Sequence, residues 1–156
     1  MRWPAKVKIL VPGKIKFPFI KEGIFFYQRR IQNYLDLEVE EKKVGKSKGP
    51  FEAKRLEGET LLKGLSPKSF KIALDERGVL WDSSSFATHF GEILDSKREI
   101  IFLLGGAYGL DDKVLAAADL KLSLSKLTLN HEIALLVLLE QLYRALSILS
   151  GEPYHK

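Results

Sequence analysis

The sequence predicts one α/β domain built on a mainly parallel sheet of about five strands. Short strand-like stretches alternate with helix-like stretches along the whole chain, and the links between them are short. This alternation is typical of β–α–β units, in which consecutive strands lie parallel. No internal repeat and no linker divides the 156 residues, a length that suits a single domain with a sizeable core.

The first half of the chain contains two strand–helix pairs. Residues 5–11 alternate apolar side chains with lysines and end at a Pro-Gly pair, which predicts a strand. Residues 18–34 begin with proline and carry apolar side chains at steps of three and four, the pattern of a helix with one buried face. Alternation returns in residues 35–39, a second strand, and residues 51–65 have the thin apolar stripe of a polar helix.

The second half continues in the same way. Residues 69–74 predict a third strand, which a turn at residues 75–78 ends. A capping Asp-Ser pair opens a helix over residues 82–96. Residues 100–104 are apolar without interruption, which is typical of a strand buried on both faces of a parallel sheet. Residues 111–118 form a short helix.

Residues 119–132 are the most informative stretch of the chain. They begin with the alternation of a strand and end where a final helix starts near Asn130 and continues to about Ser150. The turn between them keeps leucines among serine and threonine hydroxyls and contains no proline or glycine, unlike an ordinary polar loop. Such a turn is either the wall of a pocket for a partly apolar ligand or a tight, buried β–α connection.

A glycine-rich segment, residues 105–109, follows the buried strand. Its spacing differs from the dinucleotide fingerprint, and no lysine follows it, which excludes a P-loop. The glycines either let the backbone approach a ligand closely or make a tight βα turn. Ligands of open α/β sheets bind beyond the carboxyl ends of the strands, here residues 74–75, 104–106 and 124–126. Backbone amides beside apolar side chains at these ends suit an adenine ring and a neutral or cationic group better than a triphosphate.

Charge and composition exclude several classes of protein. The formal charge is +5, from 25 Lys and Arg against 20 Asp and Glu, which permits contact with nucleic acid without requiring it. The basic loop at residues 42–50 is either a solvated loop or an arm that grips phosphate. The chain has no cysteine and three scattered histidines, so we expect no metal site. Neither a Ser-His-Asp order nor paired carboxylates at helical spacing supports a hydrolase.

The final helix is apolar on nearly every face. We expect a helix of this kind to be buried on all sides, with one side meeting a second subunit in a domain of this size. Glu140 and Arg144 lie four residues apart and are placed to form a structural ion pair. No apolar run suits a signal peptide or a membrane span, so we expect a cytoplasmic protein without membrane contact.

Five segments of the chain stand in the order and spacing of one known family. The chain resembles the RlmH family of the SPOUT superfamily, the methyltransferases that act on N3 of a pseudouridine in large-subunit ribosomal RNA. The resemblance covers the whole chain. It rests on residues 74–78, 105–110, 122–129 and 139–145 and on the terminal Tyr154-His155-Lys156.

The resemblance implies a fold that the alternation of elements does not show. Members of the superfamily have a mainly parallel sheet with helices on both faces, and they tie the C-terminal part of the chain into a trefoil knot. In this single domain, residues 1–156, the knotted, cofactor-binding part would be residues 70–156 or so. Ordinary fold rules argue against a knot. The resemblance further implies a homodimer, S-adenosylmethionine as methyl donor, and a pseudouridine of 23S ribosomal RNA on the assembled ribosome as substrate.

Matching the family's motifs also implies which residues serve the reaction. The expected cofactor-binding residues are Leu74, Gly105, Leu124, Ser125, Lys126, Leu127, Thr128 and Leu129. In the C-terminal tail we expect Tyr154 to stack on or hydrogen-bond the base, His155 to accept or shuttle the N3 proton, and Lys156 to hold phosphate or favour the anion. His131 and Glu140 are the second catalytic candidates. The opposing interpretation is a frayed tail, the usual state of a chain end.

Two positions depart from the family pattern. Asn130 stands where the family usually has proline, and Leu135 where it commonly has arginine. Asparagine is a good helix cap, so the start of the last helix should survive, whereas loss of the arginine weakens the expectation of activity if that side chain meets RNA or the partner. Two other hypotheses stay open: a non-catalytic dimer of the same fold that binds S-adenosylmethionine or docks on the ribosome, and an α/β nucleotide-binding module unrelated to methylation.

Overall fold

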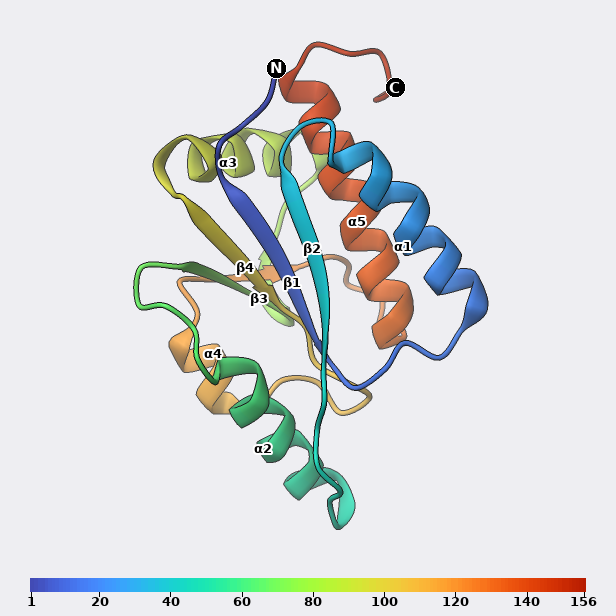
Figure 1. The fold of residues 1–156 in the computed structure, drawn as a ribbon, viewed down its shortest axis with the longest axis vertical. Helices are drawn as coiled ribbons and strands as arrows, with labels where there is room; N and C mark the ends of the chain where they lie inside the picture. Colours follow the sequence, from blue (N-terminus) through green and yellow to red (C-terminus); the bar gives the residue numbers. More distant parts are fainter.

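All five strands lie parallel in one sheet in the computed structural model, which describes residues 1–156 (Figure 1). Their order across the sheet is β2-β1-β4-β3-β5. The strands are β1 (Lys6–Pro12), β2 (Asp36–Lys42), β3 (Phe70–Leu80), β4 (Glu99–Leu103) and β5 (Leu120–Ser123). The helices are α1 (Pro18–Ile31), α2 (Gly49–Leu62), α3 (Ser83–Ser96), α4 (Asp112–Ala117) and α5 (His131–Leu149). Each pair of consecutive strands is joined through a helix, so the predicted α/β architecture with a parallel five-stranded sheet is confirmed.

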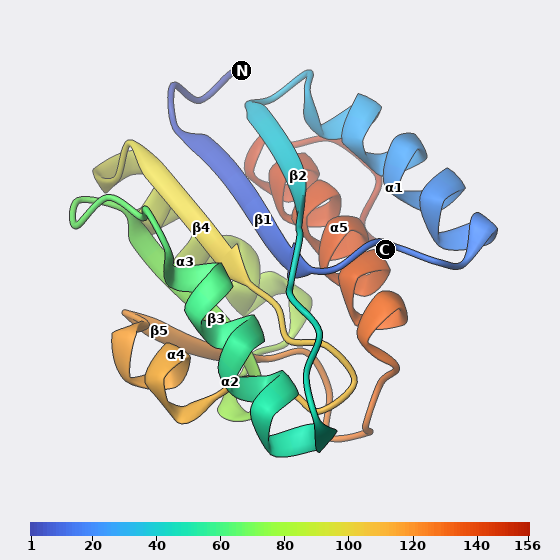
Figure 2. The ribbon, with the colours of Figure 1, turned by 60° about the horizontal axis from the view of Figure 1, so that its bottom comes forward.

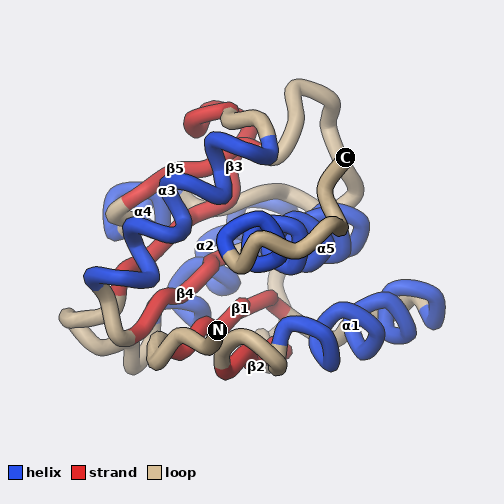
Figure 3. The backbone as a smooth tube through the Cα atoms, turned by 90° about the horizontal axis from the view of Figure 1, so that it is seen from above, coloured by secondary structure: helices blue, strands red, loops and turns tan.

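Helices cover both faces of the sheet. α1, α3 and α5 pack on one face, and α2 and α4 pack on the other. Figure 3 shows α1 and α5 together on one side of the sheet and α4 on the other. The central strand β4 sends Ile100 and Phe102 into the first layer and Ile101 and Leu103 into the second. Burial on both faces explains why this strand is apolar without interruption.

Local capping residues set the helix starts. The Asp82 carboxylate accepts a hydrogen bond from the Ser85 N–H at 2.8 Å, and Asn130 Oδ1 accepts one from the Glu132 N–H at 2.9 Å. Both predicted caps are confirmed, with Asp82 in that role rather than Ser83. Other boundaries differ from the prediction by a few residues. For example, β2 extends to Lys42, the first residue of the predicted basic loop.

β3 corrects the turn predicted at residues 75–78. The strand continues to Leu80, and its pairing with β5 shifts so that both Leu74 and Val79 face Leu122. A Cβ on Gly78 would lie 2.5 Å from the Lys121 carbonyl carbon, so only glycine lets the two strands approach so closely here. The four residues of the Asp-Glu-Arg-Gly run bend out of the pairing with β5, as in a bulge, and the strand resumes after them instead of ending.

α5 packs between α1 and α3 against the sheet. Leu138, Leu139 and Leu142 are fully buried there, but Ile133 in the first turn is 40% exposed. Within one chain the start of α5 is therefore not covered on all sides, and the expectation that a second subunit covers the remaining side stays a prediction. No helix of the protein combines the length and the apolar character that a membrane crossing requires.

Candidate active site

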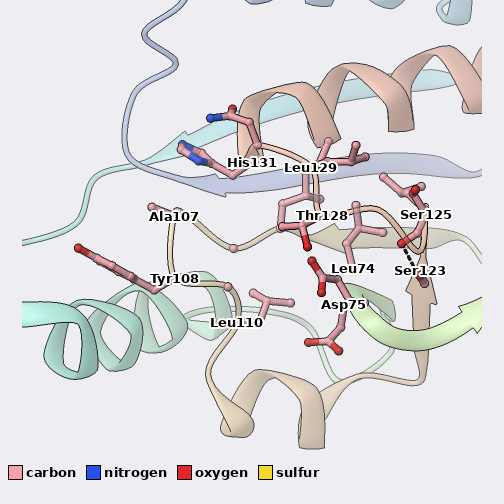
Figure 4. Close-up of a pocket in the computed structure, with 18 of the residues that line it drawn as sticks. Leu74, Asp75, Ala107, Tyr108, Leu110, Ser123, Ser125, Thr128, Leu129 and His131 are labelled. Carbon is pink, nitrogen blue, oxygen red and sulfur yellow. Dashed lines mark hydrogen bonds between the residues drawn. The ribbon is translucent and has the colours of Figure 1, made fainter.

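A cavity of about 690 Å³ lies beyond the carboxyl ends of β3, β4 and β5 (Figure 4). Three segments form its walls: the end of β3 with its bulge, the link from β4 to α4, and the link from β5 to α5. Parallel strands end at one edge of a sheet, which is why links far apart in the sequence meet here. The volume is in the range of small-molecule sites.

Most residues expected to hold a cofactor line this cavity. They are Leu74, Gly105, Leu124, Ser125, Leu127, Thr128 and Leu129. Lys126 is exposed and does not line it. Of the candidate catalytic residues, His131 lines the cavity, whereas Glu140 and the tail do not. The structure thus brings most of the expected cofactor-binding residues together and divides the catalytic candidates, with His131 at the cavity and Glu140 beside the tail; the roles of both sets stay predictions.

The β5–α5 link is held in shape by its own polar groups. Ser123 Oγ donates to the Ser125 carbonyl oxygen at 3.1 Å, and Ser125 Oγ accepts from the Leu127 N–H at 2.9 Å. Leu127 is 76% exposed, and Leu124 and Leu129 are only half-buried. The link is therefore a pocket wall that presents leucines, and the alternative of a tight, buried connection is wrong.

The glycine-rich segment, residues 105–109, folds back so closely that its own backbone atoms leave no space for a side chain at Gly105. A Cβ on Gly105 would lie 2.5 Å from the Gly109 carbonyl carbon, and Gly109 has a φ of 81°, which favours glycine. Gly106 is pressed on α2, where its added Cβ would meet the Glu57 carboxylate at 2.9 Å. The segment is thus a tight βα turn, and the same turn lines the cavity. Tyr108, at its tip, is 52% exposed and extends away from the other labelled side chains in Figure 4.

Asp75 places a negative charge at the cavity. The sequence identifies it only as part of a strand end and assigns no role to its side chain. The Arg77 guanidinium donates two hydrogen bonds to the Asp75 carboxylate, at 2.9 and 3.1 Å, and the Arg77 backbone N–H donates a third at 2.9 Å. These bonds hold the pKa of Asp75 below its usual range against the opposing effect of burial, so the carboxylate is charged at neutral pH. The guanidinium points outward, with 69% of its side chain exposed against 12% for Asp75. A signal was present, because Asp75 directly follows a predicted strand end.

The C-terminal tail is docked on α5 rather than frayed. The Tyr154 hydroxyl donates to Glu140 Oε2 at 2.7 Å, and its ring contacts Tyr143 with centroids 4.7 Å apart. Arg144 pairs with the same Glu140 oxygen at 2.8 Å, which confirms the predicted structural pair. Arg144 also contacts His155 Nδ1 at 2.9 Å. The tail is therefore tied down through side chains of α5, and the frayed alternative is wrong.

Burial and hydrogen bonds shape the acid–base behaviour of this cluster. Burial, together with the hydrogen bond to Glu140, raises the pKa of Tyr154 far above its usual value, so the phenol stays protonated. Burial alone raises the pKa of Glu140, but hydrogen bonds from Arg144 and Tyr154 outweigh it and bring that pKa below its usual range. Glu140 is thus an ionised carboxylate that holds the tail.

The tail cluster lies well away from the cavity of its own chain. Glu140 stands nine residues after His131 on α5, which corresponds to about 13 Å along the helix axis. Lys156 is exposed and makes no ion pair. Nor do three His, Cys, Asp or Glu side chains converge anywhere as a group that could bind a metal ion.

The two departures from the family pattern both have a structural role. Asn130 lines the cavity and caps α5. Leu135 is 1% exposed within the layer of α1, α3 and α5, and it is not part of the cavity wall. Neither departure removes a charged group that the described site depends on.

Comparisons with known proteins agree with this arrangement. Residues 5–155 match the family model described as "Predicted SPOUT methyltransferase". A "Ribosomal RNA large subunit methyltransferase H" from Trichlorobacter lovleyi is 45% identical over 96% of this chain and 99% of its own. A protein of the same name from Carboxydothermus hydrogenoformans is 40% identical over 97% of this chain and 99% of its own.

The chain therefore belongs to the SPOUT methyltransferases and, within them, to the RlmH family, as its motifs predict. The hypothesis of an unrelated nucleotide-binding module is wrong. A solved structure described as a probable methylase family protein from Haemophilus influenzae is similar in fold, with a TM-score of 0.57. It is 15% identical and matches 98% of this chain and 71% of its own, so the likeness concerns the fold alone.

Proposed function

We propose that this protein is a ribosomal RNA methyltransferase that uses S-adenosylmethionine to methylate N3 of a pseudouridine in 23S ribosomal RNA, on the assembled ribosome in the cytoplasm. The observation that carries the proposal is its similarity, over nearly the full length of both chains, to proteins named ribosomal RNA large subunit methyltransferase H. The cavity supports it, because three of the five segments that match the family's motifs, residues 74–78, 105–110 and 122–129, surround one space of suitable volume.

The residues around the cavity suit S-adenosylmethionine. Leu74, Leu124 and Leu129 offer apolar surface for an adenine ring, and the links between them offer backbone amides and carbonyls. Asp75 offers a carboxylate to a cationic ligand, although Arg77, which also lines the cavity, already pairs with it. When bound, the cofactor supplies an activated methyl group. The chain's own contribution is to hold and orient the cofactor and to exclude water from the transfer.

The proton on N3 must leave during the transfer, and the chain offers two places for a group that receives it. His131 lies on the cavity wall and is the nearest candidate in the same chain. The tail candidates, Tyr154, His155 and Lys156, belong to a cluster about 13 Å further along α5. We infer that the tail serves the cavity of a second subunit, which makes the homodimer part of the mechanism.

The exposed apolar surface beside α5 supports a homodimer. Phe19, Phe25 and Phe26 on α1 are 57%, 63% and 47% exposed, and α1 packs against α5. With Ile133 they form an apolar surface of the kind that marks a protein contact. A two-fold contact over this surface would bring the α5 helices of two subunits near each other.

We also propose that residues 70–156 are knotted as in other SPOUT proteins. The strand order supports this, because the chain passes from β4 across β3 to reach β5 at the sheet edge. The β4–α4 and β5–α5 links also lie side by side around one cavity, an arrangement compatible with such a knot.

Mass spectrometry of large-subunit ribosomal RNA tests the proposed activity. RNA from a strain that lacks this gene is compared with RNA from the same strain after the gene is restored. We expect one methylated pseudouridine to vanish and return. Purified protein with S-adenosylmethionine should then restore the methyl group on ribosomes from the deficient strain. An unchanged methylation pattern overturns the proposal.

A further inference from the structure

Two links at the carboxyl edge of the sheet carry exposed lysines. Lys14 and Lys16 lie in the β1–α1 link, and Lys43, Lys46 and Lys48 lie in the β2–α2 link. Figure 2 shows both links at the same edge of the sheet as the links that form the cavity. We refer to these five residues as the lysine rim.

Backbone hydrogen bonds connect the lysine rim to the cavity wall. The N–H groups of Lys16 and Phe17 donate to the Glu132 carboxylate at 2.9 and 3.0 Å. Glu132 directly follows His131, which lines the cavity. The β2–α2 link leads into α2, whose Lys54 lines the cavity from the other side. The two links of the rim are therefore each joined to the cavity wall, one through Glu132 and the other through α2, so the rim lies beside the cavity.

Three glutamates near the rim bind other groups of the protein rather than the rim lysines. Both oxygens of Glu132, which is 3% exposed, accept N–H groups of the β1–α1 link. Glu41 accepts the N–H of Ile15 at 2.9 Å, and Glu40 pairs with Lys42 at 2.8 Å. No member of the rim forms an ion pair, although nine other pairs occur in the molecule. The N–H groups do not cancel the charges of Glu41 and Glu132, but the five lysines outnumber these two carboxylates, so the rim keeps a net positive charge.

Exposed aromatic rings beside the rim indicate which polyanion it suits. Phe51, three residues after Lys48, is 83% exposed, and Tyr108 at the cavity is 52% exposed. Lysines that contact phosphates and rings that stack on bases are the combination used for single-stranded and looped RNA. An acidic protein segment would use the charges but has less need of the rings.

We propose that the lysine rim binds phosphates of the RNA that enters the cavity and so positions the substrate loop over it. The inference rests on the proposed function, since it assumes an RNA substrate. It resolves the basic loop at residues 42–50 as a phosphate-binding arm rather than a solvated loop. The rim contacts the RNA backbone, so its contribution is independent of sequence and decreases with salt.

The expected effect follows from counterion release. Each phosphate neutralised on single-stranded RNA contributes about 0.7 to the slope of log K against log salt. Replacing Lys43, Lys46 and Lys48 by Gln should therefore reduce the slope by about 2 and weaken binding on the order of 100-fold near ~0.1 M salt. The affinity for S-adenosylmethionine should not change, because none of the three lysines lines the cavity.

A matched variant controls for net charge. Lys63→Gln, Lys68→Gln and Lys97→Gln remove the same charge from exposed residues that precede β3 and β4, at the opposite edge of the sheet. Wild type and both variants are compared for binding to purified ribosomes and to protein-free large-subunit RNA at several salt concentrations. Thermal unfolding and calorimetric binding of S-adenosylmethionine show whether each variant is folded.

The outcomes separate this inference from the proposed function. A loss of binding and of salt slope confined to the rim variant supports the inference, whether or not methyl transfer is seen. Equal binding by the rim and control variants overturns it, as does a wild-type protein that binds neither ribosomes nor RNA. Wild-type protein that binds in the expected salt-dependent way but transfers no methyl group overturns the proposed function and leaves the rim in place.

Discussion

Gly105→Ala tests whether the glycine turn shapes the cofactor cavity. The added Cβ would lie 2.5 Å from the Gly109 carbonyl carbon and 2.6 Å from its oxygen, whereas ordinary contact begins at 3.4 Å. The two backbone segments must therefore separate by 3.4 − 2.5 = 0.9 Å, and no flexible side chain can absorb that movement. Overpacking of this kind costs about 1 to 3 kcal/mol of unfolding free energy.

Two measurements follow from that displacement. Thermal unfolding should show a lower Tm, by about 2 to 4 °C for each kcal/mol in a domain of this size. Because Gly105, Gly109 and Leu110 all line the cavity, calorimetry should show S-adenosylmethionine bound at least ~10-fold more weakly, the effect of a loss of about 1.4 kcal/mol. Gly45→Ala is the matched control, since a Cβ there meets nothing within 4 Å. If Gly105→Ala keeps the wild-type Tm and affinity, the argument about the turn fails.

Three further predictions concern the tail and two half-buried acids. Removal of Tyr154–Lys156 should abolish methyl transfer and preserve S-adenosylmethionine binding, because the tail does not line the cavity of its own chain; turnover by the shortened protein would contradict this. Burial raises the pKa of Glu57, and its Oε1 has no hydrogen-bond partner. Its ionisation therefore destabilises the fold as pH rises above 4.5, and Glu57→Gln should gain stability over the wild type as pH rises, with the gain vanishing in acid. The pKa of Glu140 is lowered, so its ionisation has the opposite effect on the stability of the fold. Ionised Glu140 stabilises the fold above pH 4.5, and this stabilisation is lost as pH falls through the folded-state pKa. Glu140→Gln should flatten that acid limb in chemical unfolding measured across pH, and an unchanged limb would exclude Glu140 as its source.

Much of the fold follows from local patterns. Periodicity fixes the alternation of strands and helices, and the uninterrupted apolar run of β4 places that strand in the middle of the sheet. The convergence of strand ends follows from parallel pairing alone, so the cavity could be placed before its walls were seen. Asn130 could be assigned as a cap because capping involves only neighbouring backbone N–H groups.

Features that depend on distant partners escaped prediction. The Asp75–Gly78 run has the residues of a turn, and only its contact with Lys121 on β5 makes it a bulge within β3. Glu132 has the sequence context of an ordinary first-turn acid, yet it holds the β1–α1 link more than a hundred residues away in the chain. Local rules cannot assign these roles because the partners become neighbours only after the sheet forms.

The separation of tail and cavity leads to a last prediction about subunits. If the tail of one subunit serves the cavity of the other, each active site needs an intact tail and an intact cavity from different chains. At an S-adenosylmethionine concentration too low to fill the weakened cavity of Gly105→Ala, subunits shortened before Tyr154 and subunits with Gly105→Ala should each be nearly inactive alone, for different reasons. Random mixing makes half of the dimers mixed, and each mixed dimer has one complete site, so activity should return to about a quarter of the wild-type level.

The same mixing experiment excludes the alternative arrangement. If each tail instead contacts the cavity of its own chain, the shortened subunit lacks a tail and the cavity of the Gly105→Ala subunit stays largely unfilled at the same low cofactor concentration, so mixing restores nothing. Refolding the two variants together and separately, followed by a methylation assay on ribosomes from the deficient strain, distinguishes the two cases. The docked tail favours complementation. Tyr154 and His155 are held by Glu140 and Arg144, and α5 with its apolar neighbour α1 is the surface available to a second subunit.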